Sequence, residues 1–386
     1  MIFDKLFQLM AERRASDIFI TAGAPIHAKV QGDTQPLNQQ VMTPAMIQRM
    51  VDEFITPEQK LRFESDRELN VSHGVAGLGN FRINLFWQRN SISVVMRFIQ
   101  GQIPALEELG LPPELAGVVQ EKRGLVLIVG STGSGKSTTL ASMVDHRNRT
   151  CSGHILTIED PIEYLFKHRK SLVNQREVGI DTHSWHEALR NAMRQAPDCI
   201  LIGEIRDRET MQAALAYAQA GHLCLATLHA NNAHHALNRI THFFPLDNRP
   251  LLHLDLAVAL RCIVSQRLVK QPDGKRIAAV EMLMNTRHIG ELIESGALGE
   301  IREAMEKSLC PGSQTFEQDL FRLHREGRIS LDEALSHADS PTNLSWLINH
   351  SQHGNESDGA EHAPSSAAAD LRFQSFSLSL DERPGG

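Results

Sequence analysis

The pattern of hydrophobic and polar positions in the first hundred residues differs from the pattern in the rest of the chain. Phe3, Leu6, Phe7 and Met10 recur at helical spacing and predict a helix over residues 2–14. Breakers within 99–105 predict a linker, so residues 1–98 are predicted to form a small α+β domain. Its other predicted elements are a helix at about 44–55 and strands at 17–21, 26–31, 67–73, 80–88 and 91–98.

Beyond the linker, short continuous apolar runs alternate with segments of helical periodicity. This alternation predicts an α/β domain with a mostly parallel sheet covered by helices on both faces. Residues 250–345 are predicted to be mainly helical, and residues 351–386, with little apolar periodicity, are predicted to be a disordered tail. The predicted strands are 125–129, 154–158, 199–203 and 223–227, and the predicted helices are 136–147, 184–195, 207–220 and 232–242.

Composition narrows the classes of protein that remain. The 386 residues are 41% hydrophobic and 22% charged, which is typical of a globular chain. A net charge of −7 without a basic block weighs against a dedicated nucleic-acid binder. No apolar run is long enough to span a membrane and no signal peptide is visible, so a cytoplasmic location is expected. The five scattered cysteines predict neither a zinc site nor a disulfide framework.

A glycine-rich phosphate-binding loop carries the clearest chemistry. Residues 125–137 read LVLIVGSTGSGKS, a buried strand that runs into G-x-x-x-x-G-K-S and then into a helix. Backbone N–H groups and the helix N-terminus would cradle phosphates, Lys136 would add charge, and the Ser137 hydroxyl suits Mg²⁺. The sequence therefore predicts binding of ATP with Mg²⁺. The predicted contacts are Gly130, Ser131, Thr132, Gly133, Ser134, Gly135, Lys136, Ser137 and Thr138.

Two further predicted strands end in carboxylates, which should meet the loop because ligands bind at the carboxyl ends of parallel strands. One run is followed by Glu159, Asp160 and Glu163. The other is followed by Gly203 and Glu204, a Walker-B-like element in which Glu204 replaces the usual aspartate. Arg206 fits either an ion pair at a helix start or a sensor of the γ-phosphate.

Histidines and arginines supply the remaining candidates. His222 and His229 stand at the two ends of the strand predicted at 223–227, and His229 lies at the functional, carboxyl end. A structural role for His222 stays equally open. Period-two alternation places Arg82 and Arg97 on the non-core face of neighbouring strands in the small domain.

In this order and spacing, the motifs resemble the type II/IV secretion ATPase superfamily. The resemblance runs from residue 1 to about residue 345 and is strongest to the PilT-like ATPases of type IV pilus retraction, in particular their PilU-type members. It implies a RecA-like P-loop domain over 106–350 and a PAS-like fold for the small N-terminal domain. The most specific segments are 176–181, 221–232, 242–245 and 315–321.

The resemblance also implies roles and partners. Glu163 would be the general base, Glu204 would act on Mg²⁺ through water, and Arg82 and Arg97 would reach a bound nucleotide. His222 and His229 would form the family's histidine box. The family implies a ring of six copies that works with a PilT-like ATPase and an inner-membrane platform protein, peripheral to the membrane.

Two departures from relatives within the superfamily bear on function. The extra N-terminal domain and the four-cysteine zinc site of many secretion and pilus-assembly ATPases are not found, which favours retraction. Residues 287–293 lack the Ala-Ile-Arg segment of PilT, which favours a PilU-type ATPase that depends on PilT. A secretion or pilus-assembly ATPase, a nucleotide-binding regulatory subunit and a nucleic-acid translocase remain alternatives.

Overall fold

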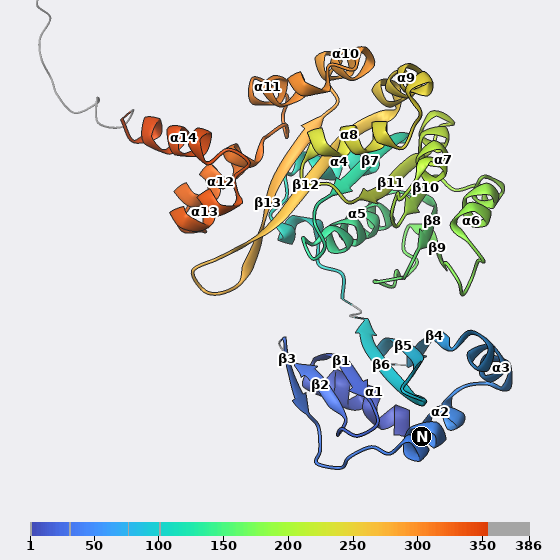
Figure 1. The fold of residues 1–386 in the computed structure, drawn as a ribbon. Helices are drawn as coiled ribbons and strands as arrows, with labels where there is room; N and C mark the ends of the chain where they lie inside the picture. Colours follow the sequence, from blue (N-terminus) through green and yellow to red (C-terminus); the bar gives the residue numbers. More distant parts are fainter. Residues whose placement is uncertain (1, 31, 76, 100–101, 354–386) are drawn as a thin grey trace, which may run out of the picture.

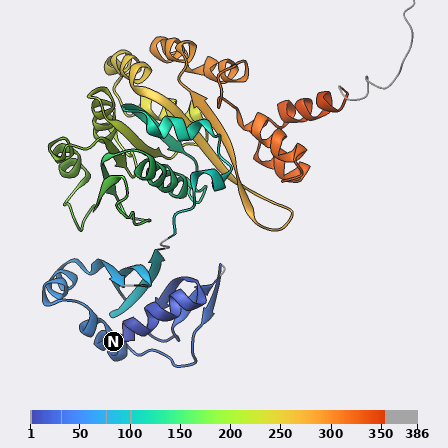
Figure 2. The ribbon, with the colours of Figure 1, turned by 180° about the vertical axis from the view of Figure 1, so that it is seen from behind.

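The fold consists of two domains, one on each side of residues 100–101. A computed structural model describes residues 2–30, 32–75, 77–99 and 102–353. The N-terminal domain lies on one side of the larger C-terminal domain, and the view from behind shows the same separation (Figures 1 and 2). Helix α14 (Pro341–His353) begins in the region predicted to be helical and includes the first residues of the predicted tail, whereas residues 354–386 of that tail lie outside the described residues.

The N-terminal domain is built on an antiparallel sheet with strand order β3-β2-β1-β6-β5-β4. Its helices cover one face, where Phe3, Phe7 and Phe81 are fully buried. The polar face of β5 and β6 carries Arg82 directly opposite Arg97, as the alternation predicted. The elements are α1 Ile2–Arg13, β1 Ala15–Ile20, β2 His27–Val30, β3 Asp33–Pro36, α2 Pro44–Phe54, α3 Pro57–Asp66, β4 Glu68–Val75, β5 Gly79–Gln88 and β6 Ser91–Ile99.

Local signals explain why α2 and α3 begin where they do. Thr43 and Thr56 each accept a hydrogen bond from a backbone N–H in the first turn, and a proline follows each of them. Proline is favoured at the first helical position because its ring presets the helical φ and it lacks an N–H that would go unpaired there. In α3, Gln59 completes a capping box by bonding back to the Thr56 N–H. The sequence pattern predicted α2 but not α3.

The C-terminal domain is built on a seven-stranded sheet with order β13-β12-β7-β11-β10-β8-β9. All neighbours are parallel except β12 and β13, which form an antiparallel hairpin at one edge. The strands are β7 Gly124–Val129, β8 Gly153–Glu159, β9 Ser171–Glu177, β10 Cys199–Ile202, β11 Leu223–Leu228, β12 Leu260–Lys270 and β13 Arg276–Met284.

Helices bury both faces of this sheet. Along β7, Leu125, Leu127 and Val129 belong to one hydrophobic core, whereas Val126 and Ile128 belong to the core on the opposite face. The first face is covered mainly by α6–α11 and the second by α4 and α5 (Figure 1). The helices are α4 Glu114–Gln120, α5 Lys136–Thr150, α6 Trp185–Ala192, α7 Arg208–Gln219, α8 Ala233–His242, α9 Arg249–Ala259, α10 Arg287–Ser295, α11 Ile301–Glu306, α12 Phe316–Arg325, α13 Leu331–His337 and α14 Pro341–His353, with short 3-10 turns at Leu106–Leu109, Met193–Gln195, Leu246–Asn248 and Leu298–Glu300.

The prediction that residues 250–345 are mainly helical is wrong for β12 and β13, which together form the long hairpin. Their apolar pattern is interrupted by buried polar residues that serve specific partners. Ser265 donates to Glu281 at 3.0 Å, and Gln266 accepts a hydrogen bond from Thr139 at 2.9 Å. Strands β3 and β9 were also not predicted.

The five cysteines are free thiols. Cys199, Cys224 and Cys262 are buried in strands β10, β11 and β12 of the large sheet, and burial raises the pKa of each thiol. Cys151 and Cys310 are partly exposed. Within the described residues, no helix combines the length and the apolar character that crossing a bilayer requires.

Candidate active site

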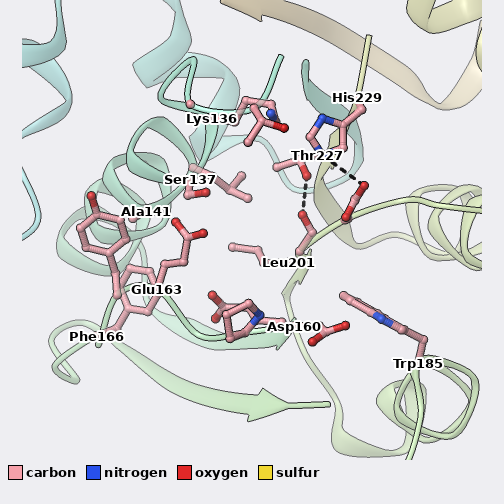
Figure 3. Close-up of a pocket in the computed structure, with 18 residues that line it drawn as sticks. Lys136, Ser137, Ala141, Asp160, Glu163, Phe166, Trp185, Leu201, Thr227 and His229 are labelled. Carbon is pink, nitrogen blue, oxygen red and sulfur yellow. Dashed lines mark hydrogen bonds and ion pairs between the residues drawn. The ribbon is translucent and has the colours of Figure 1, made fainter. Parts of the chain in front are cut away.

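A cavity at the carboxyl ends of the parallel strands, where open α/β sheets bind ligands, brings together part of the candidate set: Thr132, Gly133, Lys136, Ser137, Glu163, Glu204 and His229. Figure 3 shows Lys136, Ser137, Glu163 and His229 around this cavity. It has a volume of about 230 Å³. Its walls are formed by Thr132, Gly133, Lys136, Ser137, Leu140, Ala141, Glu159, Asp160, Pro161, Glu163, Tyr164, Phe166, Trp185, Leu201, Gly203, Glu204, Thr227 and His229.

The phosphate-binding loop requires glycine at its first position. Gly130 has a φ of 155°, and a Cβ there would overlap Ser134 Oγ and lie 2.6 Å from the Gln266 carbonyl oxygen. The backbone therefore passes closer to its neighbours than any side chain would allow. Ser134 Oγ is buried without a hydrogen-bond partner, so the loop still holds a polar group that a ligand could satisfy.

The side chain of Lys136 is held within the loop that would bind a phosphate. The residue is 8% exposed, and Nζ donates to the carbonyl oxygens of Gly130 at 2.9 Å and Ser131 at 2.8 Å. Burial lowers the pKa of Lys136, and the carboxylates of Glu204 and Glu163 oppose that shift. Both carboxylates are thus close enough to act on the same charged group.

The acidic loop, residues 159–163, begins at the last residue of β8 and places its three carboxylates in different environments. Glu163 and Asp160 line the cavity near Lys136 and Arg206, respectively. Glu159 accepts hydrogen bonds from Thr157 at 2.6 Å and Gln175 at 3.1 Å. Burial raises the pKa of Glu159 to about 7, although these hydrogen bonds lower it. Glu159 is therefore the carboxyl in this loop whose protonation changes near neutral pH.

We expect Glu159→Gln to weaken the pH dependence of stability. The folded protein retains the Glu159 proton between about pH 4.5 and pH 7, where the unfolded chain has lost it, so this contribution to stability falls as pH rises. The carboxyl also borders the cavity, where water screens its charge and reduces the effect. We therefore expect Glu159 to contribute on the order of 1–2 kcal/mol to the change in unfolding free energy between the two pH values. Urea unfolding of both proteins at pH 5 and pH 8 measures it. Identical pH slopes would contradict the assignment, since other titrating groups are common to both proteins.

Glu204 lies between two basic groups. Its carboxylate is 3.3 Å from His229 Nε2 and 2.7 Å from Arg206 Nε, and Arg206 also reaches Asp160 at 3.3 Å. The hydrogen bond that Arg206 donates to Glu204 is the main cause that raises the pKa of Arg206. This arrangement favours the ion-pair reading of Arg206 and brings His229 into the site.

The residues of the site fit an Mg²⁺ ion that is bound together with a nucleotide, not one held by protein side chains alone. Among the described residues, no cluster of three or more His, Cys, Asp or Glu side chains could hold a metal by itself. Mg²⁺ usually binds through one or two protein oxygens together with water and substrate phosphates. Ser137 and Glu204 line one cavity and offer oxygen donors of that kind, so the residues fit an ion that arrives with a nucleotide.

His222 is not brought to this cavity. It precedes β11, at the amino end of the strand, whereas His229 follows the carboxyl end. Its Nδ1 lies 2.8 Å from the Pro197 carbonyl oxygen. Six residues of strand separate the two histidines, roughly 20 Å at the usual rise per residue.

The two candidate arginines of the N-terminal domain, Arg82 and Arg97, pair with carboxylates of different domains. Arg97 is two-thirds exposed and pairs with Asp17 of its own domain at 2.8 Å. Arg82 crosses to the C-terminal domain, where its Nη2 lies 3.6 Å from Glu177 Oε1. The carboxylates of Asp160 and Glu163 also act on Arg82, so this arginine lies beside the acidic loop. Glu177 was not among the predicted site residues; the only sequence signal was its position in the segment 176–181.

Comparison with known proteins agrees with the family predicted from these motifs. The family described as Type II/IV secretion system protein matches residues 1–335. The chain is 46% identical to the type IV pilus ATPase PilU of Pseudomonas aeruginosa, across all of this chain and 99% of that protein. It is 38% identical to the type IV pilus retraction ATPase PilT of the same organism, across 89% of this chain and all of PilT.

A solved structure extends the agreement to the fold. The crystal structure of the pilus retraction motor PilT with bound ADP has a TM-score of 0.83 and 40% identity, and covers 89% of this chain and 98% of that one. The predicted fold class, family and enzyme class are therefore confirmed. The chain belongs to the type II/IV secretion system ATPase family, among its type IV pilus ATPases.

Proposed function

We propose that this ATPase is a motor of the type IV pilus machinery that drives or assists retraction, and thereby twitching motility, together with a PilT-like ATPase. The observation that carries the proposal is that Lys136, Glu163 and Glu204 surround one cavity, in a chain similar to PilU over its whole length. A regulatory subunit that only binds nucleotide would need neither carboxylate there.

The residues divide the chemistry of ATP hydrolysis among themselves. The P-loop from Gly130 to Thr138 binds the phosphates, with Lys136 as the compensating charge. Glu163 orients the attacking water and takes its proton. Ser137 and Glu204 would hold Mg²⁺, Glu204 through water, and the ion would offset charge on the phosphate oxygens. His229 holds the Glu204 carboxylate, and His222 supports the opposite end of the same strand.

Arg82 and Arg97 serve the reaction from the N-terminal domain. Both would compensate charge that develops on the transferred phosphate, as arginine fingers do. In a ring of six copies with head-to-tail contacts, that phosphate can belong to the neighbouring copy. Such a ring would sit at the cytoplasmic side of the inner membrane, against the platform protein of the pilus.

We expect a strain that lacks this chain to keep its surface pili but lose twitching motility or retraction force. Restoring the wild-type chain should restore motility, and restoring a Glu163→Gln chain should not, because pulling a pilus requires hydrolysis. Deleting the PilT-like partner, alone and in combination, tests the dependence on it. Retraction measured by fluorescent pilus imaging and surface piliation measured by shearing give the two readouts.

Other outcomes identify other functions. Loss of surface pili would indicate a pilus-assembly ATPase, and loss of secreted proteins with normal pili would indicate a secretion ATPase. ATP turnover that rises strongly with single-stranded DNA would indicate a nucleic-acid translocase. Each of these results would contradict the proposed retraction function.

A further inference from the structure

Glu177 is a buried carboxylate next to the active site that the reaction chemistry leaves without a role. It is the last residue of β9, an edge strand of the large sheet, and its side chain is 5% exposed. It is not among the residues that line the cavity. A buried charge is costly unless hydrogen bonds and an opposite charge compensate it, so its contacts indicate what it does.

One oxygen of Glu177 holds the acidic loop. Oε2 accepts a hydrogen bond from the backbone N–H of Ile162 at 3.1 Å. Ile162 directly precedes Glu163, so this contact fixes the peptide that carries the proposed base into the cavity. Glu177 is itself held in place, because its N–H donates to Asp181 Oδ2 at 2.9 Å.

The other oxygen meets the N-terminal domain. Oε1 lies 3.6 Å from Arg82 Nη2, and Arg82 comes from β5, on the far side of the linker. The Arg82 side chain is 24% exposed, so water screens this pair only partly. A single carboxylate therefore touches both the arginine of one domain and the loop of the other.

We propose that Glu177 is a positioning residue that couples the location of Arg82 to the conformation of the loop that carries Glu163. While Arg82 is paired with Glu177, the charge of the carboxylate is compensated and Oε2 keeps the Ile162 N–H in place. When the N-terminal domain moves and takes Arg82 away, the buried carboxylate loses its opposite charge, which is strongly unfavourable. The loop then rearranges, so movement of the small domain changes the position of the base.

This coupling rests on the proposed role of Glu163 for its effect on turnover, but not for its effect on the loop. Glu177→Gln retains an oxygen that can accept the Ile162 N–H and removes the charge that pairs with Arg82. Glu177→Ala removes both contacts. Glu187→Gln, an exposed change on nearby α6, is the matched control.

The first measurement is amide hydrogen exchange of the peptide that contains Ile162, in the protein without nucleotide. We expect Arg82→Gln and Glu177→Ala both to accelerate exchange there, and Glu187→Gln to leave it unchanged. Arg82 lies in the other domain, so a purely local structural role of Glu177 would not transmit its loss. Unchanged exchange in Arg82→Gln would overturn the coupling, whatever residue is the base.

The second measurement is a double-mutant cycle on turnover. We expect Glu177→Gln to lower kcat about tenfold with little change in ATP binding, because it affects the reacting geometry and not the phosphate contacts. Adding Glu177→Gln to Arg82→Gln should cost little more than Arg82→Gln alone, because the pair is already broken. Wild-type kcat in Glu177→Gln, or effects that multiply, would overturn the proposal.

A parallel assay of Glu163→Gln separates the two assignments. Normal turnover in that variant would refute Glu163 as the base while leaving the exchange result for Glu177 and Arg82 valid. Slow turnover in Glu163→Gln together with independent, multiplying effects at Glu177 and Arg82 would refute the coupling and leave the base assignment intact.

Discussion

Lys136→Ala is expected to reduce ATP turnover by at least about a hundredfold, because the side chain supplies preorganised positive charge where phosphate charge develops. The position is suited to this, since Lys136 is almost fully buried and its ammonium is fixed by two carbonyl oxygens of the P-loop. A phosphate would compete with those oxygens for the same donors. The steady-state ATPase rate of the purified protein measures the effect.

The control must show that a loss of ATP turnover does not result from unfolding of the protein. Lys122→Ala removes the same side chain from an exposed position before β7 and should keep wild-type turnover. Thermal unfolding of both variants reports whether the fold persists. A folded Lys136→Ala protein with normal turnover would show that the P-loop assignment is wrong.

Glu163→Gln is expected to reduce turnover by about 100-fold or more while ATP still binds, because an amide cannot accept the proton of the attacking water. The substitution keeps the size of the side chain and removes one negative charge from a cavity that should receive a triphosphate, so affinity should be unchanged or higher. Binding of a fluorescent ATP analogue and the rate of a single turnover measure the two effects separately.

Neighbouring carboxylates provide the comparison. Glu204→Gln removes the acceptor charge for His229 and Arg206 and should raise the Mg²⁺ concentration needed for half-maximal activity, which Glu163→Gln should not. Normal turnover in Glu163→Gln would move the base elsewhere in the acidic loop. Glu159, which also lines the cavity and has a pKa raised by burial to about 7, would then be the next candidate.

The sequence predicted the centre of the large sheet because burial there leaves a simple pattern. Every residue of β7 is buried, so the strand reads as one apolar run that ends at the P-loop. The hairpin β12–β13 was missed because Ser265 and Gln266 interrupt its pattern with buried polar groups, which pair with Glu281 across the hairpin and with Thr139 of α5. Hydrogen bonds between residues this far apart in the sequence cannot be predicted from a local pattern.

Local sequence patterns also locate only some of the residues of the candidate active site. Lys136, Glu163, Glu204 and His229 could be located because each follows a buried strand at its carboxyl end, where one sheet edge gathers them. Glu177 also ends a strand, but β9 is an edge strand whose pattern is half polar. Its contact with Arg82 spans 95 positions and two domains, which no local pattern records.

The distribution of the cysteines divides them into two chemically different groups. Only the thiolate reacts with alkylating and maleimide reagents, and burial suppresses that form in Cys199, Cys224 and Cys262. Cys151, at the end of α5, and Cys310, ahead of α12, remain accessible. The natural chain therefore offers two labelling positions, one at the end of the helix that begins in the P-loop and one beside the C-terminal helices. Fluorescent dyes attached there could follow movements of the enzyme without any change to its core.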